Sequence, residues 1–347
     1  MNLQWRGPAG RRTPALAVAL ALQAAGVPAW AADSAVVFMY HRFGETAYPT
    51  TNIRIEQFES HIKELKNGKY AVLPLPEIVA ALREKRSLPD NAVALTVDDA
   101  FASVYTEAWP RLKAAGLPFT LFVATDPIDG RTAGMMSWDQ VRELAGSGVT
   151  IGAHTASHGH MPERSMAENT AEIEKSNARF KAELGGVPGL FAYPYGEMSR
   201  AIGALAEKSG YRAAFGQHSG VAWTDGNFYY LPRFALNEHY GDLDRFRLAA
   251  RALPLPARDI IPADPMLGPG NNPPLFGFTV AEEVAKGAAR LECYVSSQGK
   301  ARIERLDRRI EVRMPRAFAP GRGRINCTMP ARDGRWRWFG MQFYIPK

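Results

Sequence analysis

The chain has 347 residues, 46% of them hydrophobic, which is enough for one large domain and a smaller second one. Its 42 Lys and Arg residues exceed its 35 Asp and Glu residues, giving a net charge of +7. Because these basic residues are scattered and not massed in one region, the sequence argues against nucleic acid as a partner.

The N-terminal segment, residues 1–31, has the pattern of a cleavable signal peptide. Arginines precede an apolar run over residues 15–27, and the sequence A-W-A at 29–31 supplies a small-x-small cleavage site. That run is too short to span a bilayer, and no later stretch is apolar for long enough. We therefore expect a mature chain that starts near Ala32, has no transmembrane segment, and is exported to a periplasm or to the outside of the cell.

From residue 34 onward, apolar strand patterns alternate with amphipathic helix patterns. The strand patterns cover residues 35–40, 70–73, 92–97, 119–124, 149–153, 189–193 and 213–216. The helix patterns cover residues 58–65, 76–85, a segment that ends at 115, 137–146, 165–184 and 201–209. This alternation predicts an α/β fold in which about seven parallel strands form a distorted (β/α) barrel over residues 32–253. In such barrels the functional side chains lie on the loops that follow the strands.

Two adjacent aspartates, Asp98 and Asp99, follow the predicted strand over residues 92–97. Neighbouring carboxylates repel each other, so the pair is more stable when a cation or a shared proton offsets the repulsion. A metal site is one interpretation of this pair, and a solvated turn is the other.

A second group consists of His154 and His158, with His160 just after them. Two imidazoles four residues apart can face one cation when the segment curls through a turn, and imidazole with carboxylate is a favoured ligand set for zinc. Histidines at this spacing also occur as loop residues that satisfy local hydrogen bonds. Combined with the aspartate pair, the pattern predicts a metal site of Asp99, His154 and His158, with open positions for water and substrate.

A third group is the turn F-A-Y-P-Y-G at 191–196, which contains Tyr193, Pro194 and Tyr195. Pro194 and Gly196 restrict the backbone and thereby hold the N–H of Tyr195 near a strand end. A rigid N–H donor at that place could stabilise an oxyanion. The other interpretation is an aromatic turn packed on the rim of the barrel.

Taken in order, these three stretches resemble the motifs of the polysaccharide deacetylase family, the NodB-homology domain of carbohydrate esterase family four. The family patterns T-F-D-D-G, H-[ST]-x-x-H and R-x-P-Y-G correspond here to T-V-D-D-A at 96–100, H-T-A-S-H at 154–158 and A-Y-P-Y-G at 192–196. The resemblance covers residues 36–253.

The resemblance implies a role for each motif residue. Asp98 would be the catalytic base, and the N–H of Tyr195 would bind the developing oxyanion. The implied cofactor is a divalent metal ion, Zn²⁺ with Co²⁺ or Ni²⁺ as alternatives, which would polarise the acetamide carbonyl and activate water. The implied metal ligands are Asp99, His154 and His158, and the implied substrate-groove residues are Pro194 and Tyr193.

One departure from the family pattern concerns the residue that orients the base. Ala192 stands where many members have an arginine, and no D-x-x-D-W stretch accompanies it. The variant F-x-Y-P-Y-G resembles the branch that contains poly-N-acetylglucosamine deacetylases. Arg233 could take over the orienting role and contact the substrate, with an ordinary salt bridge as the alternative. Ala100 replaces the family's glycine, which we interpret as a mild change.

After residue 253 the pattern changes. Residues 254–274 are rich in proline, which predicts a semi-rigid linker or a long loop wrapped on the barrel. Strand patterns at 291–296, 301–306, 309–314, 323–329 and 335–345 predict a small all-β, sandwich-like domain over residues 275–347. The two cysteines, Cys293 and Cys327, lie within two of these strands and could form a disulfide. The nearby aromatic residues are either a sugar-stacking face or part of a core; they are Trp336, Trp338, Phe339 and Tyr344.

We therefore expect an exported, metal-dependent hydrolase that removes N-acetyl groups from an amino-sugar polysaccharide, with poly-N-acetylglucosamine exopolysaccharide as the favoured substrate. Peptidoglycan or chitooligosaccharide is the alternative substrate, and exopolysaccharide synthesis or export machinery is an expected partner. An alternative of another class is a non-catalytic glycan-binding protein, although such a protein has no need of both aspartates and both histidines. The acid that protonates the leaving amine is the gap in this assignment, with His239 and His218 as candidates.

Overall fold

The structure is a computed structural model that describes residues 1–4 and 31–347. The signal peptide predicted for residues 1–31 therefore lies outside the described residues, apart from its two ends. Within the described part, no helix combines the length and the apolar character needed to cross a membrane.

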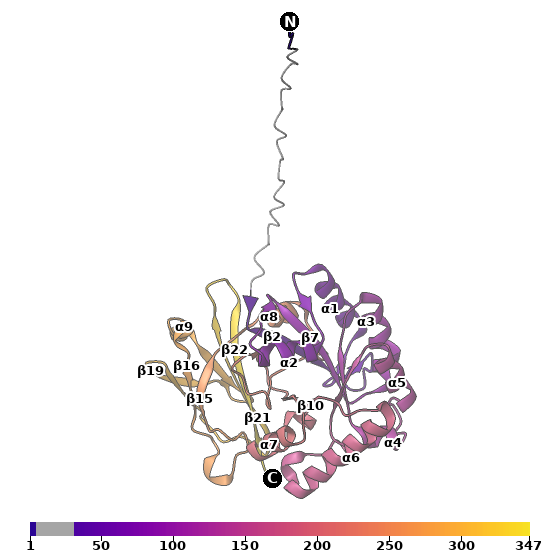
Figure 1. The fold of residues 1–347 in the computed structure, drawn as a ribbon. Coiled ribbons are helices and arrows are strands. Elements are labelled where there is room, and N and C mark those ends of the chain that lie inside the picture. Colours follow the sequence, from indigo (N-terminus) through magenta and orange to yellow (C-terminus); the bar gives the residue numbers. More distant parts are fainter. Residues whose placement is uncertain (5–30) are drawn as a thin grey trace.

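The larger part of the molecule is a curled parallel β-sheet with helices on its outer side (Figure 1). The order of the main strands is β11-β10-β9-β8-β7-β2, and each neighbouring pair is parallel. Short parallel pairings add β5 to β7 and β13 to β2. The strands are β2 (Ser34–Tyr40), β5 (Ala71–Val72), β7 (Ala92–Asp98), β8 (Thr120–Val123), β9 (Thr150–Ala153), β10 (Leu190–Ala192), β11 (Ala213–Phe215) and β13 (Phe234–Ala235).

Short irregular pairings close the gap between β11 and β2. β12 (Ala222–Trp223) runs antiparallel to the start of β2, while Leu231 hydrogen-bonds with residues 214 and 216 beside β11. The predicted distorted barrel is thereby confirmed, with one side built from a loop segment in place of a long strand. Two further pairs of two-residue strands lie at the edges: β1 (Ala31–Ala32) with β6 (Leu88–Pro89), and β3 (Arg42–Phe43) with β4 (Asn52–Ile53).

Burial and capping explain why these elements form where they do. Every residue of β2 and of β7 is buried, as expected for parallel strands that are covered on both faces. Ser137 and Ser165 form the capping boxes that open two helices, and Gly116 ends another in the left-handed conformation. The barrel helices are α1 (Ile55–Asn67), α2 (Leu75–Arg83), α3 (Trp109–Ala115), α4 (Thr125–Asp129), α5 (Trp138–Gly146), α6 (Met166–Leu184), α7 (Arg200–Lys208) and α8 (Leu243–Ala250).

Residues 253–347 form a second part, here called the β-module, made of two sheets. The first has the order β14-β22-β21-β17-β18 and the second has the order β15-β16-β20-β19. Cys293 in β17 and Cys327 in β21 are directly paired and form the predicted disulfide. The strands are β14 (Leu253–Pro254), β15 (Ala257–Ile261), β16 (Phe276–Val280), β17 (Glu292–Val295), β18 (Gly299–Lys300), β19 (Arg302–Leu306), β20 (Arg309–Arg313), β21 (Gly321–Pro330) and β22 (Trp336–Ile345), with the short helix α9 (Glu282–Ala285) between β16 and β17.

The structure corrects one expectation about this region and decides between two alternatives for another. Residues 254–274 are not only a linker, because β15 pairs with β16 and Pro254 pairs with Trp338 of β22. The prolines at 256 and 262 flank β15, an edge strand, so they bound the strand without removing its ladder. For the aromatic residues, the structure favours packing over a sugar-stacking face. Phe339 packs in the module core against Phe278, and buried Tyr344 donates its hydroxyl to Glu163 of the barrel.

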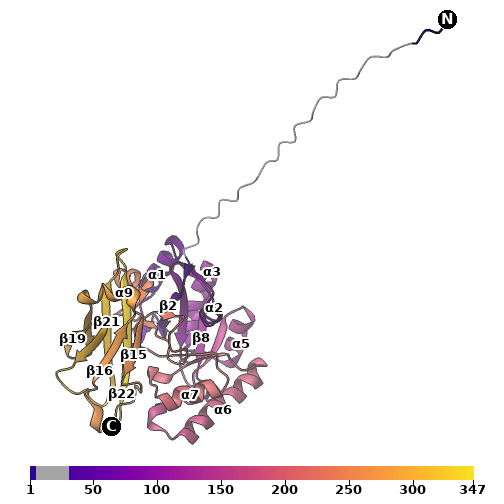
Figure 2. The same cartoon turned by 60° about the vertical axis from the view of Figure 1, so that its left-hand side comes forward.

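The β-module lies against the barrel and shares a hydrophobic core with it (Figure 2). Trp338 of β22 packs edge-on against Phe234 of β13, with 5.1 Å between the ring centroids. Arg335 forms an ion pair of 2.8 Å with Asp90. The β-module and the barrel are therefore packed together at this interface.

Buried His61 on α1 makes the stability of the barrel dependent on pH. Its Nδ1 lies 3.0 Å from the hydroxyl of Tyr40, and its Nε2 lies 2.9 Å from the carbonyl oxygen of Gly241. Burial lowers the pKa of His61 to about 4, although the Gly241 carbonyl acts in the opposite direction. The folded chain therefore keeps this imidazole neutral, whereas the unfolded chain binds a proton near pH 6.5.

We expect the unfolding free energy to fall as the pH drops from about 6.5 to about 4, with up to about 3 kcal/mol of that loss due to His61. The loss arises because the unfolded chain takes up the proton first. Urea denaturation at about pH 7 and about pH 4.5 should therefore show a smaller loss for His61→Gln than for the wild type. His239→Gln, at an exposed histidine, is the control. Equal losses in the wild type and His61→Gln would contradict the expectation.

Candidate active site

The side chains that the motifs single out lie at the carboxyl ends of the parallel strands. Asp98 is the last residue of β7 and Asp99 follows it. His154 directly follows β9, and Tyr195 lies just beyond β10. Neighbouring parallel strands end at the same edge of the sheet, so these residues meet at one end of the barrel.

Asp99, His154 and His158 form a compact cluster. Oδ1 of Asp99 lies 3.3 Å from Nε2 of His154 and 3.1 Å from Nε2 of His158. One ligand atom from each residue lies within 4.8 Å of the others. His154 is fully buried, whereas Asp99 and His158 line a cavity. The structure thus brings together the three residues predicted as metal ligands and leaves one side of the cluster open.

Hydrogen bonding leaves the facing atoms of this cluster available to a cation. Nδ1 of His154 lies 2.7 Å from the carbonyl oxygen of Ala192, so this nitrogen carries the proton and Nε2 presents a lone pair. Among the described residues, Asp99 Oδ1 and His154 Nε2 have no hydrogen-bond partner although both are buried. Two buried acceptors that face each other are unfavourable without a cation or proton between them. Two imidazoles and one carboxylate therefore fit a divalent metal ion such as Zn²⁺.

His160 does not join the cluster and instead supports Tyr195. Its Nδ1 lies 2.8 Å from the carboxylate of Glu197, and its ring stacks on Tyr195 with 4.1 Å between centroids. This packing holds the Tyr195 ring beside His158, at 4.7 Å.

Arg233 holds Asp98 in a buried, two-pronged ion pair. Nη1 and Nη2 of Arg233 donate to the two carboxylate oxygens of Asp98, each at 2.7 Å, and both side chains are fully buried. Nε of Arg233 donates to the carbonyl oxygen of Gly216 at 3.0 Å, which fixes the guanidinium plane. The guanidinium of Arg233 is engaged by Asp98, Thr96 and Gly216 inside the barrel, so the prediction that it contacts the substrate is wrong; it orients Asp98 instead.

The two aspartates are both held ionised. Burial acts to raise the pKa of Asp98, but Arg233, followed by His154, outweighs burial and holds this pKa below its ordinary value. Burial also acts to raise the pKa of Asp99, and the imidazoles of His154 and His158 outweigh it. Each oxygen of Asp98 accepts one N–H from Arg233 and keeps a second lone pair for another proton donor.

The turn at 193–196 presents only Tyr195 to the cavity. Tyr193 and Pro194 are buried, and the Tyr193 hydroxyl donates to the carbonyl oxygen of Tyr229 at 2.8 Å. The prediction that these two residues contact the substrate is therefore wrong, because their side chains support the turn from inside.

Gln342 of the β-module holds this turn from the other side, and no sequence motif points to it. Its Nε2 donates to the carbonyl oxygens of Tyr195 and Gly196, at 3.0 and 2.9 Å. Gln342 is buried in β22, where the sequence shows only a strand pattern. The conformation of Tyr195 thus depends on the module as well as on Pro194.

Several residues at the site have left-handed backbones. The φ angles are 77° at Asp99, 59° at Ala100, 63° at Thr155, 57° at His158 and 58° at Tyr195. Non-glycine residues rarely adopt this region, and each such residue costs about 1 kcal/mol or more. Such strain gathers at functional sites, where the surrounding structure holds it in place.

A cavity of about 1050 Å³ opens over the metal-ligand cluster. His239, one candidate for the acid, lines this cavity with an exposed side chain. His41, directly after β2, lines it as well, and its Nε2 lies 3.9 Å from Oδ2 of Asp98. No motif surrounds His41, and its place at the end of the first barrel strand is the one sequence signal that could have found it.

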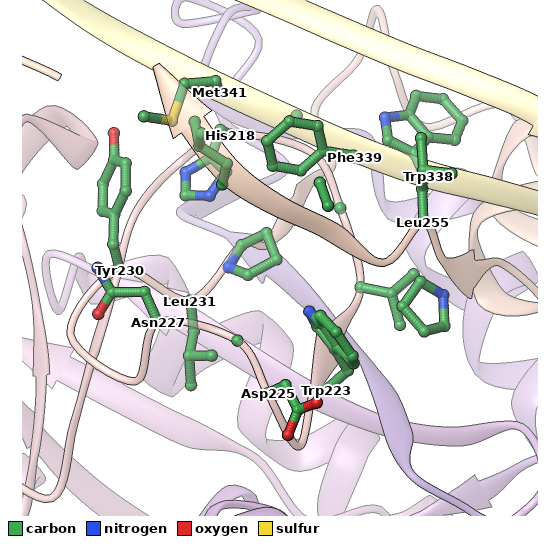
Figure 3. A pocket seen from close by; sticks show the side chains of 18 of the residues that line it. His218, Trp223, Asp225, Asn227, Tyr230, Leu231, Leu255, Trp338, Phe339 and Met341 are labelled. Carbon is green, nitrogen blue, oxygen red and sulfur yellow. The ribbon is translucent and has the colours of Figure 1, made fainter. Parts of the chain in front are cut away.

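His218, the other candidate acid, faces a different cavity (Figure 3). This second cavity of about 340 Å³ lies between the barrel and the β-module, with Trp223, Leu255 and Phe339 in its walls. Burial lowers the pKa of His218 to about 3, so its ring is neutral. The suggestion that His218 protonates the leaving amine is therefore wrong, because its ring does not reach the cavity of Asp99 and His158.

Comparison with known proteins agrees with this arrangement. Residues 85–214 match the family model for polysaccharide deacetylase. YxkH of Bacillus subtilis (strain 168) is 25% identical over 197 residues, which are 57% of this chain and 69% of the relative. The poly-beta-1,6-N-acetyl-D-glucosamine N-deacetylase of Staphylococcus aureus (strain MSSA476) is 24% identical over 213 residues, which are 58% of this chain and 73% of the relative.

Solved structures share the fold. The deacetylase PplD of Streptococcus pyogenes, in complex with acetate, superposes with a TM-score of 0.56 at 23% identity, over 60% of this chain and 94% of that one. IcaB from Ammonifex degensii superposes with a TM-score of 0.55 at 23% identity, over 64% of this chain and 98% of that one. Residues 85–214 are therefore similar to the polysaccharide deacetylase family, and the barrel has the fold of these solved structures.

Proposed function

We propose that this protein is an exported, metal-dependent deacetylase that releases acetate from an N-acetylated exopolysaccharide. The observation that carries the proposal is that Asp98, which is paired with Arg233, directly precedes the metal-ligand cluster in the chain. This cluster consists of Asp99, His154 and His158, and a large cavity opens over it. Poly-β-1,6-N-acetylglucosamine is the favoured polymer because the Staphylococcus aureus relative is named for it. The disulfide supports export, since disulfides persist mainly in oxidising compartments.

The geometry supports a division of labour among the residues. Asp99, His154 and His158 would hold Zn²⁺, Co²⁺ or Ni²⁺, which when bound supplies polarisation of the acetamide carbonyl and acidification of water. Asp98 accepts a proton from the attacking water as the water oxygen bonds to the carbonyl carbon. The N–H of Tyr195 donates to the carbonyl oxygen as negative charge develops there.

The leaving amine needs a proton when the C–N bond breaks. His41 lines the cavity close to Asp98 and is one candidate donor; burial lowers its pKa, so its ring would have to take up a proton in the substrate complex before donating it. His239 at the cavity wall is the second candidate. The products are acetate and a free amine on the sugar.

Acetate release from defined oligosaccharides tests this function. The zinc-loaded protein should deacetylate β-1,6-linked N-acetylglucosamine oligomers with a kcat/KM about tenfold above that for β-1,4-linked chitooligosaccharides or for peptidoglycan glycan strands. Release from none of these substrates would favour a glycan-binding protein and overturn the enzymatic proposal. Equal or faster release from the β-1,4-linked substrates would overturn the choice of polymer.

A further inference from the structure

Strand β21 of the β-module presents two arginines to the catalytic cavity. Side chains alternate along the strand, so that Ile325 and Cys327 are buried in the module core while Arg322 and Arg324 point to the barrel side. Both arginines line the same cavity as Asp99 and His158. The module therefore contributes a cationic wall to the site.

The charge of Arg324 has no anionic partner among the described residues. Within this part of the chain, its side chain donates one hydrogen bond, from Nε to Oε1 of the neutral Gln342 at 2.8 Å, and it forms no ion pair with a carboxylate. The remaining N–H groups of the guanidinium are available to a molecule in the cavity. Burial lowers the pKa of Arg324, and the neighbouring charge of Arg322 adds to this effect.

The ring of Tyr195 lies between Arg322 and the metal-ligand cluster. The guanidinium of Arg322 lies 5.6 Å from the ring centroid of Tyr195, and that ring lies 4.7 Å from His158. Nε of Arg322 also lies 3.8 Å from Glu197, a carboxylate that His160 shares at 2.8 Å. The cationic wall thus lies beside the reacting position. A sugar that neighbours the reacting one in the polymer would lie against this wall.

The two carboxylates that line the cavity, Asp99 and Glu238, each have other partners; Oδ1 of Asp99 lies 3.3 and 3.1 Å from Nε2 of His154 and His158. Glu238 accepts from the side-chain amide of Asn52 at 2.6 Å and lies 3.4 Å from Arg54. Arg245 is a third cation, and its Nη1 donates to the carbonyl oxygens of Ala235 and Tyr240.

We propose that Arg322 and Arg324 make the enzyme reject a polymer whose neighbouring sugar is already deacetylated. This inference rests on the deacetylase function proposed above. An N-acetyl group offers the guanidinium groups a carbonyl oxygen, which accepts hydrogen bonds. A deacetylated sugar offers an ammonium group, which only donates and carries the same charge as the wall. The enzyme therefore leaves its free amines spaced along the polymer and not in contiguous runs.

Three β-1,6-linked pentamers distinguish the effect of the ammonium charge from the effect of losing the acetyl group. The first is fully N-acetylated, the second has one glucosamine at its centre, and the third has glucose there. At about pH 6, where the amine is protonated, we expect the wild type to have a kcat/KM about tenfold lower on the glucosamine pentamer than on the acetylated one. The glucose pentamer should lie closer to the acetylated one. The double variant Arg322→Gln/Arg324→Gln should reduce the discrimination to about threefold or less, and high salt should weaken it in the wild type.

Arg302→Gln is the matched control, because Arg302 is an exposed arginine of the same module outside the cavity. It should retain the full discrimination. The inference is overturned if the wild type treats the acetylated and glucosamine pentamers alike, if the glucose pentamer is as poor as the glucosamine one, or if the double variant still discriminates fully.

Binding of the same pentamers, measured by calorimetry, keeps this test separate from the proposed function. If the wild type releases no acetate from any pentamer, the deacetylase proposal fails. A weaker binding of the glucosamine pentamer that disappears in the double variant would still support the cationic wall, and equal binding of all pentamers would overturn it.

Discussion

Asp98→Asn should lower kcat for acetate release by about 10³-fold while the protein keeps its metal ion. The carboxylate of Asp98 accepts two hydrogen bonds from Arg233. This ion pair keeps the carboxylate ionised and fixes its orientation. Asparagine has the same shape and can still accept one hydrogen bond from Arg233, but it does not take up a proton from water. Acetate release at saturating substrate and the metal content of the purified variant are the two measurements.

The neighbouring residue provides the contrast. Asp99→Asn removes one of three ligands, so we expect both the metal content and the acetate release to fall. Adding a chelator to the wild type should abolish release, and Zn²⁺ should restore it. If Asp98→Asn retained activity within about tenfold, another group would be the base. If it lost the metal as Asp99→Asn does, Asp98 would be a ligand.

The barrel could be predicted from the sequence because its strands are buried on both faces. Most residues of β2 and β7 are apolar, and continuous apolar runs of this kind can be recognised in a single sequence. The closure of the barrel by residues 222–235 could not be predicted, because two-residue strands have no periodicity of their own. β15 was hidden for a related reason, since the prolines on either side give the whole segment the composition of a linker.

The metal-ligand cluster could be predicted because its members stand in short motifs at strand ends, whereas its supports are distant in sequence. Arg233 is 135 residues from Asp98, and Gln342 is 147 residues from Tyr195. Contacts over such separations arise only when the fold forms, so no local pattern reports them. At Ala100, the sequence led us to underestimate the importance of a residue. It reads as a mild replacement of glycine, yet its φ of 59° places it where glycine is favoured.

Arg233→Met should lower the unfolding free energy by about 3–5 kcal/mol at neutral pH and also reduce acetate release. The substitution leaves the Asp98 carboxylate buried without its cation, which is the costly way to break a buried ion pair. Arg335→Met is the control for losing an ion pair. Its pair with Asp90 is partly exposed, so we expect a loss of about 1 kcal/mol or less. Urea denaturation measures both variants.

The double variant Asp98→Asn/Arg233→Met tells whether the cost comes from the unpaired charge. Because asparagine carries no charge, the double variant should be more stable than Arg233→Met alone by about 1 kcal/mol or more, even though it lacks two native groups. The double variant should remain inactive, since the base is absent. A double variant whose loss of stability equals the sum of the two single losses would mean that Arg233 stabilises the barrel through Gly216 and Thr96 and not through Asp98. In that case the effects on stability and on activity would have different causes. The Asp98–Arg233 ion pair would be a structural contact beside the site and would not be what keeps Asp98 ionised.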